Sequence, residues 1–450
     1  MCGIVGYIGK RKAYPILIKG LHRLEYRGYD SAGVALINEQ GQLNVYKAKG
    51  KVSELEAFCA TKDIDGTIGI AHTRWATHGE PNTANAHPHY SESERLAIIH
   101  NGIIENYAVL KAGLMEQGYT FKSDTDTEVL VQLVEYTQIN RHVDLKTAVQ
   151  LALQQVVGAY AIAILDKTHP DTLIAARKGS PLVVGIGEDE YFLASDATPI
   201  VEYTDQVIYV EDEEIVALRL GEKVDITTIN NVTKTPEIKR LELSLSQLEK
   251  GGYPHFMLKE IMEQPRAVKA TMAPRIKGSE ILLDDVDIDL KQINNIMITA
   301  CGSAYYAGCA AKYAIEKLCR IPVITELASE LRYSDPLIDE HTLLIVLSQS
   351  GETADTIAAM RECQRRGAKT LAIVNVVGST IAKIADWCLY TWAGPEIAVA
   401  TTKGYTTQLT VLYLFALYAA KKMETVDDST WRKHLSALKA LPKQIQQALD

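Results

Sequence analysis

The sequence predicts an α/β protein with two dissimilar domains, and a contrast between its halves carries the prediction. The first half is rich in short β-type runs bounded by Gly, Pro, Asn or Asp, such as GIVGYI, TIGIAHT and AYAIAILD. A few helical patterns separate these runs, which favours a layered α+β domain. In the second half, apolar runs such as NIMITA, TLLIVL and TLAIVN lead into loops of small residues and then into helical patterns. Such repeated units indicate a parallel sheet covered by helices.

A polar and charged stretch separates the halves and predicts a domain boundary between about Lys234 and Gly252. We expect a first domain over residues 1–235, and a linker with a helical lead-in over 236–284. A parallel-sheet domain is expected over 285–425, followed by a helical connecting segment over 426–450.

Composition excludes several classes of protein. The chain has 450 residues, of which 47% are hydrophobic and 23% charged, and a net charge of −9. This charge argues against a nucleic-acid partner or an anionic membrane surface. No apolar run approaches the ~20 residues that span a bilayer, and no secretory signal is visible. The seven cysteines are scattered and have no metal-ligand spacing, which favours a cytoplasmic protein with free thiols and no metal.

Cys2 follows Met1 directly, and two interpretations of it are open. Free cysteine is often buried as a small apolar residue, so Cys2 is typical of the start of a buried strand. Cysteine is also small enough for Met1 to be removed, which leaves Cys2 with a free α-amine that titrates near pH ~8. That amine can serve as the base for its own thiol in nucleophilic catalysis. Position alone does not decide between the two.

Three further stretches of the first half carry candidate functional residues. They are Arg74, Trp75, Thr77 and His78 in AHTRWATHGEP, Asn101 and Gly102 in HNGIIEN, and Asp124 and Asp126 in SDTDTEV. Taken singly, these stretches are typical of a surface Arg–Trp stack, a tight Asn–Gly turn and a helix N-cap.

Together with Cys2, the three stretches supply what acyl transfer from an amide requires. The Asn101 side chain and the Gly102 backbone N–H can stabilise a tetrahedral oxyanion, which contributes about 3 kcal/mol per donor. Arg74 can bind a carboxylate through two hydrogen bonds, and Asp126 can pair with an ammonium. A substrate with a carboxylate, an ammonium and an amide is an amino-acid amide, and glutamine is the natural candidate.

Two loops of the second half predict a site for an anion. SQSGET, residues 348–353, follows a buried strand and precedes a helical pattern, and ACGSAYYAG repeats this arrangement one unit earlier. Hydroxyl groups and backbone N–H groups at a helix N-terminus bind anions without a lysine, although such a loop is equally typical of an ordinary N-cap. Neither loop is a nucleotide-binding motif.

The motifs of the first half resemble the glutaminase half of the glutamine–fructose-6-phosphate aminotransferase family. The resemblance rests on CGIVGYIG, RLEYRGYDSAG, AHTRWATHGEP, NAHPH, HNGIIEN and SDTDTEV. It implies an N-terminal-nucleophile hydrolase fold, a four-layer α/β/β/α sandwich, for the glutaminase domain over residues 1–235. It also implies that Cys2 is the nucleophile and that Asn101 and Gly102 form the oxyanion hole. Arg74 and Asp126 would bind the ends of glutamine, Thr77 and His78 would lie against it, and Trp75 would gate the exit of ammonia.

The loops of the second half resemble the sugar isomerase (SIS) domain of the same family. The resemblance implies a fructose 6-phosphate site at Cys301, Gly302, Ser303, Ser348, Gln349, Ser350, Thr353 and Val399. Ala304 departs from the family pattern, which often has a hydroxyl residue there. The family has two SIS halves and a C-terminal tail, and this chain resembles its first SIS half only. We therefore expect residues 426–450 to begin the connection to a second SIS domain, and residues 1–450 to support glutamine hydrolysis only.

The resemblance implies a homodimer that converts glutamine and fructose 6-phosphate to glutamate and glucosamine 6-phosphate, the first step of amino-sugar biosynthesis, with no metal or organic cofactor. Two alternatives remain open. The first half alone also suits an amidophosphoribosyltransferase, although SQSGET is not the acidic diphosphate-binding loop of that enzyme. The SIS portion also suits a non-catalytic sugar-phosphate sensor.

Overall fold

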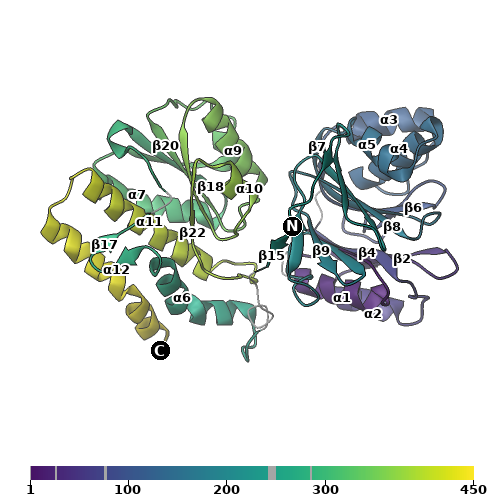
Figure 1. The fold of residues 1–450 in the computed structure, drawn as a ribbon, viewed down its shortest axis with the longest axis horizontal. Helices are drawn as coiled ribbons and strands as arrows, with labels where there is room; N and C mark the ends of the chain where they lie inside the picture. The colour runs from purple at the N-terminus through teal and green to yellow at the C-terminus, as the bar shows by residue number, and fades with distance from the viewer. Residues whose placement is uncertain (1, 26–27, 76–78, 242–249, 284–285) are drawn as a thin grey trace. The chain divides into compact units, whose positions relative to one another are not determined.

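The computed structural model describes residues 2–25, 28–75, 79–241, 250–283 and 286–450. The chain divides into two compact units, Met1–Leu245 and Ser246–Asp450, and the division falls inside the polar stretch between the halves. Each unit is described by itself (Figure 1). Across the described residues, no helix is both long and apolar enough to cross a membrane.

The first unit contains two antiparallel sheets. One has the strand order β15-β11-β9-β10-β1-β4-β2-β3 and the other β14-β13-β12-β8-β7-β6-β5. The strands of the first sheet are β1 (Gly3–Ile8), β2 (Ser31–Ile37), β3 (Leu43–Lys49), β4 (Ile68–Arg74), β9 (Val183–Gly187), β10 (Glu190–Ala194), β11 (Gln206–Tyr209) and β15 (Lys239–Arg240). Those of the second are β5 (His89–Tyr90), β6 (Leu96–Ile104), β7 (Gly158–Asp166), β8 (Thr172–Lys178), β12 (Glu214–Arg219), β13 (Asp225–Thr228) and β14 (Thr233–Lys234).

Helices cover the outer face of each sheet, so the unit has four layers. Helices α1 (Ala13–Leu24) and α2 (Val52–Cys59) lie on one side of the paired sheets, and α3 (Tyr107–Glu116), α4 (Asp126–Arg141) and α5 (Leu145–Leu153) on the other (Figure 1). Strand alternation explains the layers. On β1, Ile4 and Ile8 enter the core between the sheets, whereas Val5 and Tyr7 pack under α1 and α2. The predicted α/β/β/α sandwich is confirmed.

The second unit is built around one parallel sheet of order β19-β18-β20-β21-β22. Its strands are β18 (Asn295–Ala300), β19 (Val323–Leu327), β20 (Thr342–Ser348), β21 (Lys369–Val374) and β22 (Trp387–Tyr390). The hairpin β16 (Ile276–Lys277) and β17 (Glu280–Ile281) and the 3-10 turn Leu290–Gln292 precede the sheet.

Helices cover both faces of this parallel sheet. One face carries α6 (Phe256–Met272), α7 (Ser303–Cys319), α11 (Lys403–Lys422) and α12 (Asp428–Leu449), and the other carries α8 (Ala328–Leu331), α9 (Ala354–Arg365) and α10 (Thr380–Ile384). On β18, Ile296 and Ile298 pack against the first set, and Met297 packs against the second. The predicted parallel α/β domain is confirmed.

The strand order creates a switch point between β18 and β20. The chain leaves β18 toward α7 on one face of the sheet and leaves β20 toward α9 on the opposite face. Loops that diverge in this way open a crevice at the carboxyl ends of the strands, where ligands of open α/β sheets bind. The two loops predicted to bind an anion follow these same two strands.

Candidate active site

Cys2 lies at the end of the first sheet, immediately before β1. Gly3 is paired with Thr73 on β4, so the chain around Cys2 runs beside the end of that neighbouring strand. The backbone N–H of Trp75 donates to Cys2 Sγ at 3.2 Å, and the thiol lies 3.5 Å from the Trp75 carbonyl oxygen. Cys2 is only half-buried. Its sulfur is thus held at the rim of the sandwich, outside the apolar core.

Asn101 and Gly102 reach this rim from the second sheet. Asn101 Nδ2 donates to the Cys2 carbonyl oxygen at 3.2 Å, so its side chain joins β6 to the N-terminal strand of the other sheet. Gly102 has φ +138°, and a Cβ on it would stand 2.0 Å from the carbonyl oxygen of Ala159 on β7. Only glycine fits this close approach of two backbones. Cys2 and the two candidate oxyanion residues therefore come from different sheets and meet at one end.

Arg74 and Asp126 flank the rim. Arg74 is the last residue of β4, and its buried guanidinium donates to the carbonyl oxygens of Gly79 (3.3 Å) and Glu80 (3.4 Å). Asp126 is the first residue of α4, and its Oδ2 accepts the backbone N–H of Ile104 at 2.8 Å. Arg74 thus immediately precedes Trp75, whose backbone contacts the cysteine, and the Asp126 carboxylate stands beside the strand that carries Asn101 and Gly102.

Trp75 is 55% exposed although its backbone contacts the cysteine. Its ring lies against the backbone of Gly28, where a Cβ would be only 2.8 Å from the ring. Thr77 and His78, predicted to lie against the substrate, fall outside the described residues.

The structure adds four buried histidines that the sequence interpretation did not assign to the site: His72, His87, His89 and His100. Burial lowers the pKa of His72 to about 3 and lowers the pKa values of the other three as well. The rings of His72 and His87 stack 4.3 Å apart, and His72 Nε2 lies 2.9 Å from Asn101 Oδ1. A signal for two of them existed, because TIGIAHT and RLAIIHNG place His72 and His100 within otherwise apolar strands.

The loop after β18 contacts the helix that follows the loop after β20. Thr356 Oγ1 donates to Cys301 Sγ at 3.5 Å, joining α9 to the loop after β18. Gly302 has φ +58° and immediately precedes α7, which begins at Ser303. Cys301 therefore lies against the first turn of the helix that the loop at 348–353 leads into.

The loop after β20 is folded by its own hydroxyl groups. Ser348 Oγ accepts the backbone N–H of Gly351 at 3.0 Å and lies 3.2 Å from Thr353 Oγ1, while Ser350 Oγ accepts the N–H of Glu352 at 3.2 Å. Gly351 has φ +68°, and a Cβ there would stand 2.0 Å from Ser379 Oγ. These contacts hold the loop in a tight turn ahead of α9.

The two remaining predicted residues are Gln349, which belongs to this loop, and Val399, which lies on a separate segment before α11. Within the described part of the chain, the amide N and O of Gln349 are buried without a hydrogen-bond partner. Val399 is 82% exposed, and the turn before it is fixed by buried Glu260, whose Oε1 accepts the backbone N–H groups of Ile397 (2.5 Å) and Ala398 (3.0 Å). Sequence reasoning missed Glu260, and its separation from this turn leaves no local signal.

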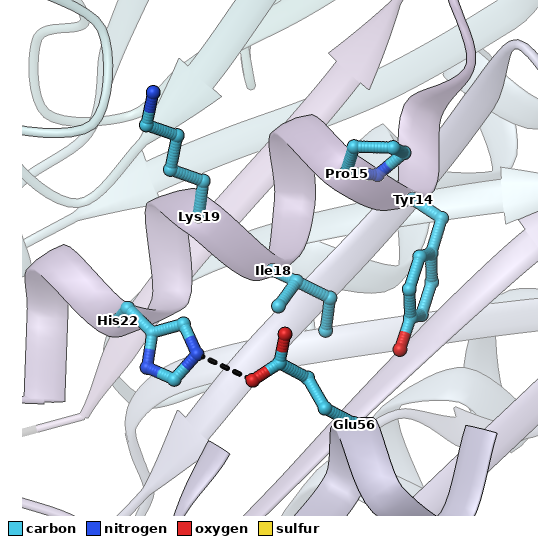
Figure 2. Close-up of a pocket in the computed structure, with 6 residues that line it drawn as sticks. All are labelled: Tyr14, Pro15, Ile18, Lys19, His22 and Glu56. Atoms are coloured by element: carbon cyan, nitrogen blue, oxygen red, sulfur yellow. Dashed lines mark hydrogen bonds and ion pairs between the residues drawn. The ribbon is translucent and has the colours of Figure 1, made fainter. Parts of the chain in front are cut away.

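A groove of about 370 Å³ lies elsewhere, on the helical layer of the first unit (Figure 2). It is lined by Tyr14, Pro15, Ile18, Lys19, His22 and Glu56 from α1 and α2, and His22 Nε2 lies 2.7 Å from Glu56 Oε2 across it. None of the candidate residues lines this groove.

Comparison with known proteins agrees with this division into two parts. A family model described as a glutamine amidotransferase domain matches residues 59–253, and one described as a SIS domain matches residues 289–418. A glutamine–fructose-6-phosphate aminotransferase (isomerizing) of Bacteroides thetaiotaomicron is 60% identical, over 100% of this chain and 74% of the relative. The chain belongs to the glutamine–fructose-6-phosphate aminotransferase family.

Other members of this family match over the same span. A relative from Caldanaerobacter subterraneus subsp. tengcongensis, which carries the same name, is 50% identical over 100% of this chain and 74% of the relative. Among solved structures, the C-terminal domain of glucosamine-fructose-6-phosphate aminotransferase from Francisella tularensis is 40% identical. It covers 43% of this chain and 56% of that chain, with a TM-score of 0.42.

Proposed function

We propose that this chain carries the glutaminase part of a glutamine-dependent amidotransferase, which hydrolyses glutamine at Cys2 and supplies the ammonia to fructose 6-phosphate to form glucosamine 6-phosphate. The observation that carries the proposal is the meeting of Cys2 and Asn101 at the rim of the sandwich, where the Asn101 amide donates to the Cys2 carbonyl oxygen at 3.2 Å. A nucleophile beside an amide donor is what acyl transfer from an amide requires.

In the proposed reaction, removal of Met1 leaves the α-amine of Cys2 to accept the thiol proton. The sulfur attacks the side-chain carbonyl carbon of glutamine, and the electron pair of the carbonyl moves to oxygen. Asn101 and the backbone N–H of Gly102 stabilise this oxyanion. Collapse of the intermediate breaks the C–N bond, the proton passes to the leaving nitrogen, and ammonia departs. Water then hydrolyses the thioester and releases glutamate.

The ends of glutamine are proposed to bind at Arg74 and Asp126. Arg74 lies beside Cys2 on β4 and offers a planar fork of N–H donors to the α-carboxylate. Asp126 has one oxygen occupied by the Ile104 N–H, and its carboxylate pairs with the α-ammonium. Thr77 and His78 are proposed to lie against glutamine, and Trp75 to gate the exit of ammonia.

Fructose 6-phosphate is proposed to bind at the switch point of the second unit. Its phosphate would be held by the hydroxyl and backbone N–H groups of the loop at 348–353 and by Ser303 at the start of α7. Cys301, Gly302, Gln349 and Val399 are proposed to line the sugar. We also propose that the protein acts as a homodimer.

The proposal is tested by incubating the chain with glutamine and fructose 6-phosphate and measuring glutamate and glucosamine 6-phosphate separately. We expect glutamate to form from glutamine, and no aspartate to form from asparagine, whose side chain is one methylene shorter. Absence of glutamate formation would overturn the proposal and favour a sugar-phosphate sensor. Residues 1–450 are expected to form glutamate without amino sugar, and amino sugar formed at the rate of glutamate would contradict that expectation.

Arg74→Lys tests the assignment of the carboxylate site. Lysine keeps the charge but loses the planar fork and the contacts to Gly79 and Glu80, so we expect the KM for glutamine to rise about 30- to 150-fold, equivalent to about 2–3 kcal/mol. The matched measurement uses 4-aminobutanamide, which lacks the α-carboxylate, and its KM should change far less. An equal change for both amides would place the carboxylate elsewhere.

Ser348→Ala tests the phosphate loop. Loss of the hydroxyl removes the acceptor of the Gly351 N–H and one proposed phosphate donor. We expect the Kd for fructose 6-phosphate, measured by calorimetry, to rise about 5- to 20-fold. The control is Ser334→Ala, at an exposed serine just beyond α8. If both variants bind with unchanged affinity, the phosphate does not lie on this loop.

A further inference from the structure

We infer that His72 is a positioning residue of this site, whose imidazole holds the Asn101 carboxamide with its NH₂ group turned toward Cys2. The inference rests on the proposed function, because the direction of this amide matters to catalysis only if Cys2 attacks a carbonyl group.

His72 and Asn101 project into the same layer from opposite sheets. On β4, Ile68 and Ile70 enter the core between the sheets, and His72 continues this alternation. On β6, Ile99 enters that core from the other side and Asn101 continues its alternation. The two polar side chains therefore face each other where the apolar core ends, with His72 Nε2 2.9 Å from Asn101 Oδ1.

The contacts of the Asn101 amide with Cys2 and His72 fit one orientation of the amide. The Cys2 carbonyl oxygen accepts from the Asn101 side chain, so the NH₂ group must lie on the Cys2 side and the oxygen on the His72 side. With the amide oxygen turned toward it, His72 Nε2 can make the 2.9 Å contact only as a donor, because two acceptors at that distance would repel each other. The proton therefore belongs on Nε2, where it is donated to Asn101 Oδ1. The flipped amide would lose both contacts at once.

The imidazole is fixed in this role by its surroundings. His72 is fully buried, and because burial lowers its pKa to about 3 it stays neutral, with a single ring proton, at ordinary pH. The ring of His87 stacks on it at 4.3 Å with an angle of 29° between the planes. His100, the next buried histidine, bonds instead to Thr127 Oγ1 at 3.0 Å, so it does not compete for the Asn101 oxygen.

The orientation of the Asn101 amide should affect the transition state of the reaction and not the binding of glutamine. A carboxamide that flips presents oxygen lone pairs to the developing oxyanion, which repels the charge that the NH₂ group would stabilise. Glutamine in its ground state carries no such charge. Loss of the His72 donor should therefore lower kcat and leave the KM for glutamine nearly unchanged.

The test uses the full chain and three substitutions. His72→Leu and His72→Phe both remove the donor, and phenylalanine keeps a ring to stack on His87. We expect kcat for glutamine hydrolysis to fall about 10- to 100-fold in either, with KM within about threefold of the parent value. His72→Gln, whose side-chain N–H can still donate to Asn101 Oδ1, should recover most of kcat. Thermal unfolding and the rate of Cys2 alkylation by iodoacetamide show which variants are folded. One folded variant that lacks the hydrogen-bond donor at position 72 is enough for the test.

A second readout separates positioning from structural damage. The γ-aldehyde of glutamate adds to the Cys2 thiol, so that a C–S bond forms, the carbonyl oxygen becomes an oxyanion and the thiol proton passes to the α-amine. Its affinity should fall by the same factor as kcat, whereas the affinity for glutamate should not change.

An unchanged kcat in a folded donor-free variant, or equal losses of affinity for aldehyde and glutamate, would overturn the inference. Failure of the unsubstituted chain to hydrolyse glutamine would instead overturn the proposed function.

Discussion

Cys2→Ala is expected to abolish glutamine hydrolysis, with kcat lower by a factor on the order of 10⁴ or more. Alanine removes the sulfur that forms the thioester, and no other described cysteine is hydrogen-bonded to the Asn101 side chain. The variant is expected to fold normally, because Cys2 is half-buried and lies outside the apolar core between the sheets. Glutamate release measured by an enzyme-coupled assay checks the loss.

Two controls accompany this variant. Affinity for fructose 6-phosphate should be retained, because its proposed site lies in the other compact unit. Cys59→Ala offers a matched control, since Cys59 lies in the same unit but is buried under the outer helices. Hydrolysis that survives in Cys2→Ala and disappears in Cys59→Ala would contradict the assignment of the nucleophile.

Asn101→Leu is expected to lower kcat about 10²- to 10³-fold with a small change in KM. Leucine matches asparagine in shape but cannot donate a hydrogen bond to an oxyanion, and it also leaves His72 Nε2 without an acceptor. Steady-state kinetics with glutamine as the substrate measure both parameters.

The control for this substitution is Asn106→Leu. Asn106 also makes two hydrogen bonds, to the backbone of Gln155 (2.9 Å) and Val157 (3.0 Å), but it lies beyond the end of β6 and away from Cys2. It should lower the melting temperature and leave kcat unchanged. A loss of kcat of the same size in both variants would show that damage to the fold, and not loss of an oxyanion donor, explains the effect.

The fold class was predictable because the signal for it is local. Alternation in GIVGYI sends Ile4 and Ile8 to one face of β1 and Tyr7 to the other, and an apolar run followed by a small-residue loop recurs in the second half. Strand order was not predictable, because pairings such as β1 with β10 join residues far apart in the chain. The polar stretch between the halves also conceals Lys239–Arg240, which pair with β11 as the edge strand β15.

For the candidate site too, the sequence indicated residue types but not the contacts between distant elements. The residue types pointed to a cysteine nucleophile, an amide donor and an anion loop, and the structure brings Cys2 and Asn101 together. The contacts of His72 with Asn101, and of Glu260 with the turn before Val399, join elements distant in sequence. Such contacts follow from tertiary packing and leave no pattern in the sequence. The roles of the individual site residues remain predictions.

The most direct test of the central claim, that Cys2 is the nucleophile, is labelling with a diazoketone analogue of glutamine. Loss of N₂ joins the reagent carbon to the reactive sulfur, and mass spectrometry of the digested protein locates it. We expect the label on the N-terminal peptide that begins with Cys2, and we expect excess glutamine to prevent labelling. A label on Cys301 or Cys309, or one on Cys2 that glutamine does not prevent, would contradict the account.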